Sequence, residues 1–180
     1  MKEQRRRQKL ISILNKKNLF PCHFRKYIQM FGLFKKKSFL SKEDNKRIVE
    51  AIKSTEQLTS GEIRVFIESR NALVSTMDRA AEIFFKLQMQ NTNQRNAVLL
   101  YLAVKDKEVA LFGDEGIHNQ VGTEFWNHQV NQMETLFKEN NLADGIVKCL
   151  SEVGNALIEK FPYKPGEDKN ELSDEIVFGK

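Results

Sequence analysis

The sequence predicts a three-layer α/β/α sandwich with a central mixed sheet that contains an antiparallel hairpin. Two observations lead to this fold class. Residues 97–104 (AVLLYLAV) are apolar throughout, which is typical of a central strand buried on both faces and therefore covered by helices on both sides. Only residues 105–107 separate this run from a second one, 108–112 (EVALF), and so short a connection can join only antiparallel strands.

The elements before the hairpin are indicated by capping residues and by periodicity. Ser41, with Asp44 three residues later, resembles a capping box and predicts a helix that ends near Glu56. Ile63, Val65 and Ile67 occupy alternate positions over 62–68 (EIRVFIE), which predicts a strand, and Phe66 on the other face indicates that this face is partly covered too. A broad apolar stripe then predicts a second helix over 76–89.

Two further helices are predicted after the hairpin. Gly122 is expected to interrupt a short helical turn, and Thr123 to cap a long helix that ends at 140–141. Asp144 is expected to cap the last helix, which 161–162 (Phe-Pro) ends.

Composition divides the chain into three segments, which are a basic amphipathic arm (1–37), the α/β/α domain (38–162) and a polar tail (163–180). The arm carries twelve Lys or Arg residues and one acid, although the whole chain has a formal net charge of only +5. The rest of the chain is therefore acidic on balance. Apolar residues 176–178 are expected to attach the end of the tail to the domain.

The arm is a candidate contact for an anionic partner. Its aromatic and apolar residues recur at steps of three and four between the bases, which suits peripheral contact with an anionic membrane. Three alternatives stay open, namely packing of this face on the domain, a merely solubilising arm, and contact with nucleic acid, although no specific nucleic-acid motif is present. The basic residues expected to make the contact are Arg5, Arg6, Arg7, Arg25, Lys26, Lys35, Lys36 and Lys37.

The chain is expected to be cytoplasmic, with peripheral membrane contact through the arm. It contains no run of 18 apolar residues, and the apolar stretch after its basic start is only 10–14 (LISIL), shorter than the roughly 7–15 residues of a secretory signal. Cys22 and Cys149 lie far apart without a metal-ligand spacing, so neither a zinc site nor a disulfide framework is predicted.

Several short stretches together resemble one known family. The stretches are 39–41 (FLS), 59–65 (TSGEIRV), 96–100 (NAVLL), 109–117 (VALFGDEGI), Trp126, 143–146 (ADGI), 154–157 (GNAL) and 161–162 (FP). In this order the chain from Phe39 to Pro162 resembles the TPM domain family, the phosphatase-like domain of thylakoid and membrane accessory proteins. The resemblance implies an α/β/α sandwich. It also implies either acid phosphatase activity or divalent-cation binding, as in some members, or an assembly, repair or receptor-accessory role without known chemistry, as in others.

The acidic stretch 113–116 (GDEG) is the best candidate for a site. Asp114 and Glu115 offer oxygen ligands of the kind that Ca²⁺ and Mg²⁺ prefer, and Glu62, Glu124 and Asp144 would add more if the fold brings them together. The alternative is a solvated turn in which the glycines take positive φ, with Asp144 as a plain helix cap.

Catalytic motifs are missing from the sequence. It has no Cys-x5-Arg, no DxDx and no phosphate-binding glycine-rich loop. Cys149, His118, His128 and Trp126 are each expected to be structural. We therefore predict a non-catalytic binding or accessory module that binds a divalent cation and a protein partner that the sequence does not identify. The alternative is a divalent-metal-dependent, acid phosphatase-like hydrolase built around Asp114.

Overall fold

The computed structural model describes residues 39–71, 74–139, 141–166, 173 and 175–179. The chain divides into two units, 1–37 and 38–180, of which only the second is described. The predicted membrane contacts of the arm, from Arg5 to Lys37, lie outside the described residues.

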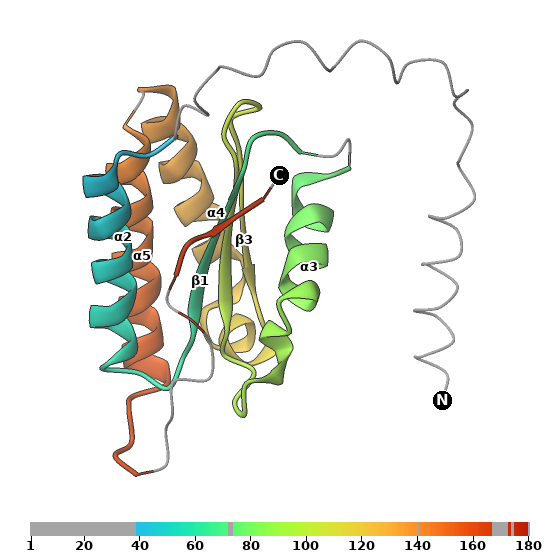
Figure 1. Ribbon diagram of the computed structural model, residues 1–180. Coiled ribbons are helices and arrows are strands. Elements are labelled where there is room, and N and C mark those ends of the chain that lie inside the picture. Colours follow the sequence, from blue (N-terminus) through green and yellow to red (C-terminus); the bar gives the residue numbers. More distant parts are fainter. Residues whose placement is uncertain (1–38, 72–73, 140, 167–172, 174, 180) are drawn as a thin grey trace, which may run out of the picture. The chain divides into compact units, whose positions relative to one another are not determined.

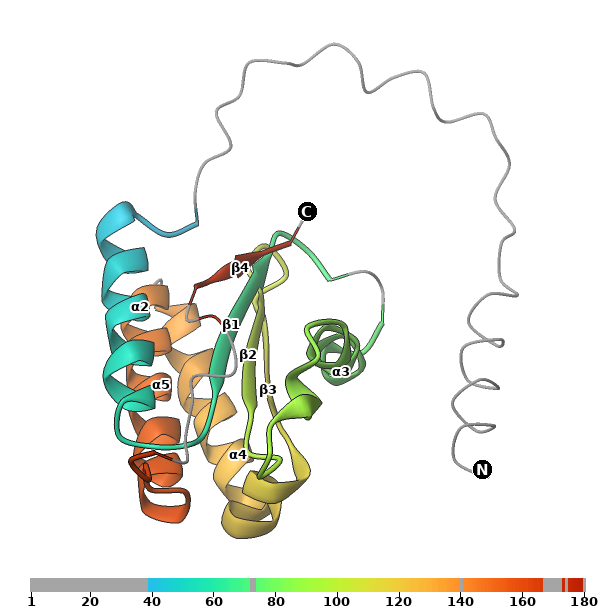
Figure 2. The same ribbon diagram turned by 60° about the horizontal axis from the view of Figure 1, so that its bottom comes forward.

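A four-stranded mixed sheet forms the centre of the domain, in the order β3-β2-β1-β4 (Figure 2). Strand β1 (Ile63–Glu68) runs parallel to β2 (Val98–Ala103), and β2 is antiparallel to β3 (Glu108–Gly113). The predicted hairpin is thus confirmed. The two-residue strand β4 (Val177–Phe178) pairs in parallel with the outer edge of β1, so the end of the polar tail is attached to the domain as expected.

Helices cover both faces of the sheet, which confirms the predicted three-layer sandwich (Figure 1). On one side lie α2 (Lys42–Glu56), α4 (Glu115–Lys138) and α5 (Leu142–Lys160), and on the other lies α3 (Thr76–Lys86), followed by a short 3₁₀ helix, Met89–Asn91. All six residues of β2 are buried, because this strand is covered on both faces.

The alternation of side chains along the strands divides the apolar interior into two cores. Val65, Leu100 and their neighbours pack against α2, α4 and α5, whereas Phe66, Leu99 and Tyr101 pack against α3. Phe66 had indicated that the second face of β1 is covered as well. The second, smaller core confirms this.

Helix α2 begins as the sequence predicts. The Ser41 hydroxyl accepts from the Asp44 amide at 3.0 Å and the Asp44 carboxylate accepts from the Ser41 amide at 3.1 Å, which completes a capping box. Gly122 has φ 73° and ψ 173° and kinks α4, so the predicted interruption is confirmed.

Two predictions at helix starts are wrong. The stretch 113–116 is not a solvated turn, because β3 runs to Gly113 and α4 begins at Glu115, with Asp114 as its N-cap. The glycines there do not take positive φ, which among the described glycines is found at Gly122 and Gly166. Asp144 does not cap the last helix. Asn141 is the N-cap of α5, and Asp144 lies within its first turn.

Candidate functional site

Asp114 lies at one end of the sheet, where β3 leads into α4. Its side chain accepts from the Glu115 amide at 2.8 Å, which caps the helix. The same carboxylate also accepts two hydrogen bonds from the Arg95 guanidinium. Arg95 Nε donates to Oδ2 at 2.6 Å and Nη2 donates to Oδ1 at 2.7 Å. Asp114 is only 4% exposed, and its hydrogen bonds to Arg95 raise the pKa of that guanidinium. The acidic residue that the sequence singles out is therefore already paired.

The two glycines beside Asp114 are required by close packing. A Cβ on Gly113 would stand 2.5 Å from the Trp126 ring, and one on Gly116 would overlap the backbone carbonyls of Gln94 and Arg95. The Gly116 amide donates to the Arg95 carbonyl at 2.8 Å. The turn 92–96 thus places the backbone of Gln94 and Arg95 on the start of α4. This contact and the Trp126 ring together give the two glycines of 113–116 a structural explanation.

The other predicted metal ligands are spread over the domain. Glu62 is buried at the same end of the sheet as Asp114, because its carbonyl accepts from Val98 at the start of β2. Glu115 and Glu124 are exposed on α4, and Asp144 lies on α5, paired with an arginine. Within the described part of the chain, no three His, Cys, Asp or Glu side chains are grouped so that they could hold a metal ion.

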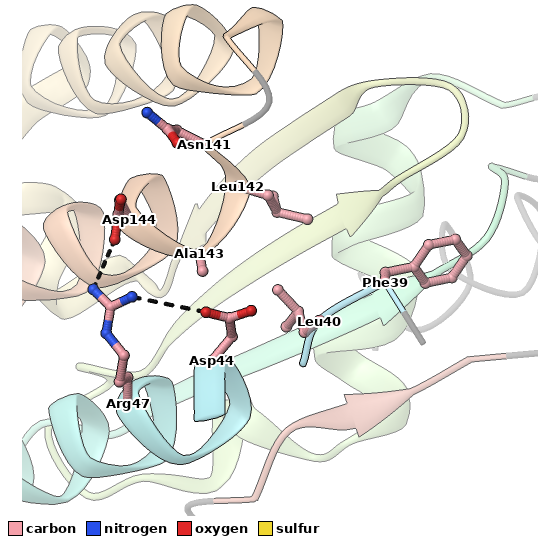
Figure 3. Close-up of a pocket in the computed structure, with 8 residues that line it drawn as sticks. All are labelled: Phe39, Leu40, Asp44, Arg47, Asn141, Leu142, Ala143 and Asp144. Carbon is pink, nitrogen blue, oxygen red and sulfur yellow. Dashed lines mark hydrogen bonds and ion pairs between the residues drawn. The ribbon is translucent and has the colours of Figure 1, made fainter. Parts of the chain in front are cut away.

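Asp144 contributes to a small surface pocket between the starts of α2 and α5 (Figure 3). Arg47 links the two helices there, with Nη2 at 2.7 Å from Asp144 Oδ1 and Nη1 at 3.7 Å from Asp44 Oδ1. Hydrogen bonds from the Ser41 side chain, and then from its backbone, lower the pKa of Asp44. The pocket has a volume of about 220 Å³, below the roughly 300–1,000 Å³ of sites that bind drug-sized ligands.

A buried polar network that the sequence analysis missed lies between the sheet and α3. Glu68 accepts from Arg79 Nε at 2.9 Å and from the Tyr101 hydroxyl at 2.6 Å on one oxygen, and from Arg79 Nη2 at 2.8 Å on the other. Burial by itself would raise the pKa of Glu68, but the hydrogen bonds from Arg79 and Tyr101 outweigh it and lower the pKa. The signal in the sequence was Glu68 itself, which shares the covered face of β1 with Phe66.

The residues considered for catalysis have structural surroundings. Burial raises the pKa of the Cys149 thiol to about 12, so the thiol stays protonated at neutral pH. His118 accepts at Nδ1 from the Trp126 indole, at 3.2 Å, and His128 lies 2.5 Å from Gln132 one turn further on. Trp126 is 7% exposed and belongs to the larger core.

A protein family and a solved structure each match most of the chain. A family model described as the TPM domain matches residues 33–156. The solution structure of the BA42 protein from the psychrophilic bacterium Bizionia argentinensis is 40% identical in sequence and has a TM-score of 0.73. That match covers 81% of this chain and 99% of BA42. No curated protein matches the chain.

A second solved structure is similar at lower identity. It is the N-terminal domain of the cg2496 protein from Corynebacterium glutamicum, 14% identical, with a TM-score of 0.49. The match covers 77% of this chain and 87% of that domain. Among the described helices, none is long and apolar enough to cross a membrane.

Proposed function

The chain belongs to the TPM domain family, and from that premise we propose that it is a non-catalytic binding module that acts as an accessory to another protein. The observation that carries the proposal is that both oxygens of Asp114 already have partners within the fold. This carboxylate caps α4 and holds Arg95 through both of its oxygens. Its role is therefore to join residues 92–96 to the helix.

Metal-dependent hydrolysis at Asp114 would require the metal ion to compete with the Arg95 guanidinium for the carboxylate. A cation at Asp114 would have to displace the Arg95 guanidinium from a bidentate pair, which is the strong geometry for an arginine and a carboxylate. The same applies at Asp144, which Arg47 holds at 2.7 Å. The buried, protonated thiol of Cys149 does not provide a nucleophile at neutral pH.

Replacement of Asp114 by Asn tests the proposal. Asn caps helices as well as Asp does, so the variant keeps the cap but loses the charge that holds Arg95. We expect a loss of about 1–2 kcal/mol in the free energy of unfolding, reduced because Arg95 is half-exposed, and no change in phosphate-ester hydrolysis. Glu134→Gln is the matched control, since it removes an exposed charge from the same helix at a position that is not a candidate metal ligand.

Two results would favour the metal-dependent, acid phosphatase-like alternative. One is hydrolysis of a phosphate ester by the purified chain that Asp114→Asn abolishes while Glu134→Gln retains it. The other is a shift of the Asp114 and Glu115 amide signals when millimolar Ca²⁺ or Mg²⁺ is added. The binding-module proposal expects no hydrolysis to depend on Asp114. It does not keep the divalent cation expected from the sequence, because Arg95 holds both oxygens of Asp114, and it therefore expects these signals to stay in place.

The proposed partner contact is at an anionic membrane surface on the cytoplasmic side, through residues 1–37. What supports this is the charge of the segment, with twelve bases and one acid in a chain whose remainder is acidic on balance. Each Lys or Arg near an anionic surface contributes about 1 kcal/mol of attraction at physiological ionic strength.

A further inference from the structure

The outer edge of β1 is closed by a segment that joins the domain from far along the chain. Strand β4 makes two ladder pairs with β1, Phe66 with Val177 and Ile67 with Phe178. The Gly179 amide extends the ladder by donating to the Ile67 carbonyl at 2.8 Å. Residues 161–175 separate this segment from the end of α5, and the last thirteen of them, 163–175, follow the bridge between Thr59 and Pro162.

The segment is recognised by its side chains as well as by its backbone. Ile176 packs on the core formed with α2 and α5, and Val177 packs on the core formed with α3, so the two residues close both cores at this edge. Phe178 is half-exposed, at 52%. The segment thus presents two apolar anchors to the domain and leaves its third large side chain largely in solvent.

Gly179 lies in a position that excludes a larger residue. A Cβ there would stand 2.8 Å from the Cβ of Glu68 and 2.9 Å from the end of the Phe66 ring. Glu68 cannot move aside easily, because Arg79 and Tyr101 hold both of its oxygens. The buried network therefore provides the rigid wall of a glycine-sized slot at the end of the edge.

We propose that the outer edge of β1 is a strand-docking site for an extended segment of the sequence Ile-Val-Phe-Gly, filled by residues 176–179 of the same chain and able to take that segment from a second copy. Backbone pairing supplies part of the binding, and pockets for alternate side chains together with the glycine slot supply selectivity, as in other cases where a peptide adds a strand to a sheet. The site lies away from Asp114 and does not depend on the function proposed for the family domain.

The covalent connection to the domain determines whether residues 176–179 of the same chain or of a second copy occupy the site. Covalent connection through residues 163–175 gives the resident segment an effective concentration on the order of millimolar, so it outcompetes a free segment at micromolar concentration. Fully extended, thirteen residues reach roughly 45 Å, more than the radius of gyration of about 14 Å expected for the domain. The segment can therefore also reach the edge of a neighbouring copy.

The test measures binding of a fluorescently labelled synthetic peptide, residues 173–180, to the full-length chain. In one variant, Val177→Asp places a charge at a partly buried position that packs on the smaller core, so the resident segment detaches from the edge of β1. In its matched control, Phe178→Asp, the same charge stands at the neighbouring, half-exposed position. By fluorescence anisotropy we expect the peptide to bind Val177→Asp at least about tenfold more tightly than the wild type, and Phe178→Asp to resemble the wild type.

A second full-length variant is used in case Val177→Asp fails to fold. A protease site replaces residues 167–172, and the protein is cut after folding, so that the resident segment dissociates on dilution. The cut protein should then bind the peptide, whereas a peptide with Gly179→Val should bind about tenfold more weakly or worse. Equal binding to wild type and Val177→Asp, no binding to the cut protein, or equal binding of the two peptides would each overturn the proposal.

Discussion

The replacement of Tyr101 by Phe isolates a single buried hydrogen bond. Tyr101 is fully buried in the middle of β2, and its hydroxyl donates to Glu68 Oε1 at 2.6 Å. Phe keeps the ring and its stacking on Phe66, at a centroid distance of 6.2 Å, so no large cavity forms. Hydrogen bonds to charged groups contribute about 1.5–3 kcal/mol, and we expect the free energy of unfolding to fall by that amount at neutral pH.

The same bond makes the loss dependent on pH. The pKa of Glu68 is lowered in the folded protein, so its ionised form stabilises the fold above the ordinary pKa, near 4.5, and this contribution is lost as the pH falls through the folded-state pKa. Tyr101 donates to the ionised carboxylate and supports this preference. The difference between wild type and Tyr101→Phe should therefore narrow as the pH falls below 4.5.

Urea denaturation followed by the fluorescence of Trp126, the one tryptophan of the chain, measures both quantities. Tyr163→Phe is the matched control, because Tyr163 is 43% exposed and its replacement should change stability by less than about 0.5 kcal/mol. If Tyr101→Phe costs no more than this control, or if the difference stays constant down to acidic pH, the bond to Glu68 does not stabilise the ionised carboxylate and the reasoning is wrong.

Three further predictions concern other parts of the chain. Gly122→Ala should lower the free energy of unfolding by about 1–3 kcal/mol in urea denaturation, because φ 73° and ψ 173° lie in a region that only glycine adopts readily. No atom lies within 4 Å of the added Cβ, so the loss would come from the backbone alone, and an unchanged midpoint would contradict this prediction. In a Cys22→Ser background, Cys149 should react with a thiol reagent at neutral pH only as fast as the domain unfolds, since burial raises its pKa to about 12, and a rate that is independent of added urea would refute this. Deletion of residues 1–37 should abolish co-sedimentation with liposomes that contain anionic lipid, and binding that survives the deletion would exclude the arm as the membrane contact.

The fold was predictable where local signals decide it. The connection 105–107 is too short for anything except a hairpin, and the apolar run before it requires cover on both faces. The capping box at Ser41 has a geometry set by residues within one helical turn, so its sequence spacing was sufficient. These features depend on neighbours in the chain.

The candidate site was less predictable because its contacts join distant residues. Arg95 meets Asp114 across 19 positions, and this happens because residues 92–96 fold back onto the start of α4. Glu68 and Tyr101 are separated by 33 positions and meet through the register of two parallel strands. A carboxylate between two glycines indicates an acidic turn in sequence. The structure shows instead that Gly113 is required by the Trp126 ring and Gly116 by the backbone of Gln94 and Arg95, both of which are distant in the chain.

The placement of β2 between two strands and between two layers of helices has a consequence for amide hydrogen exchange. Its six residues are buried, so their amides should exchange only when the whole domain unfolds, and their exchange rates should report the global stability. The amides of β4, at the edge and held by two ladder pairs, should exchange through a local opening that leaves β2 protected. The difference between the two strands in one spectrum would thus measure how often the sheet loses its outermost strand while the domain stays folded.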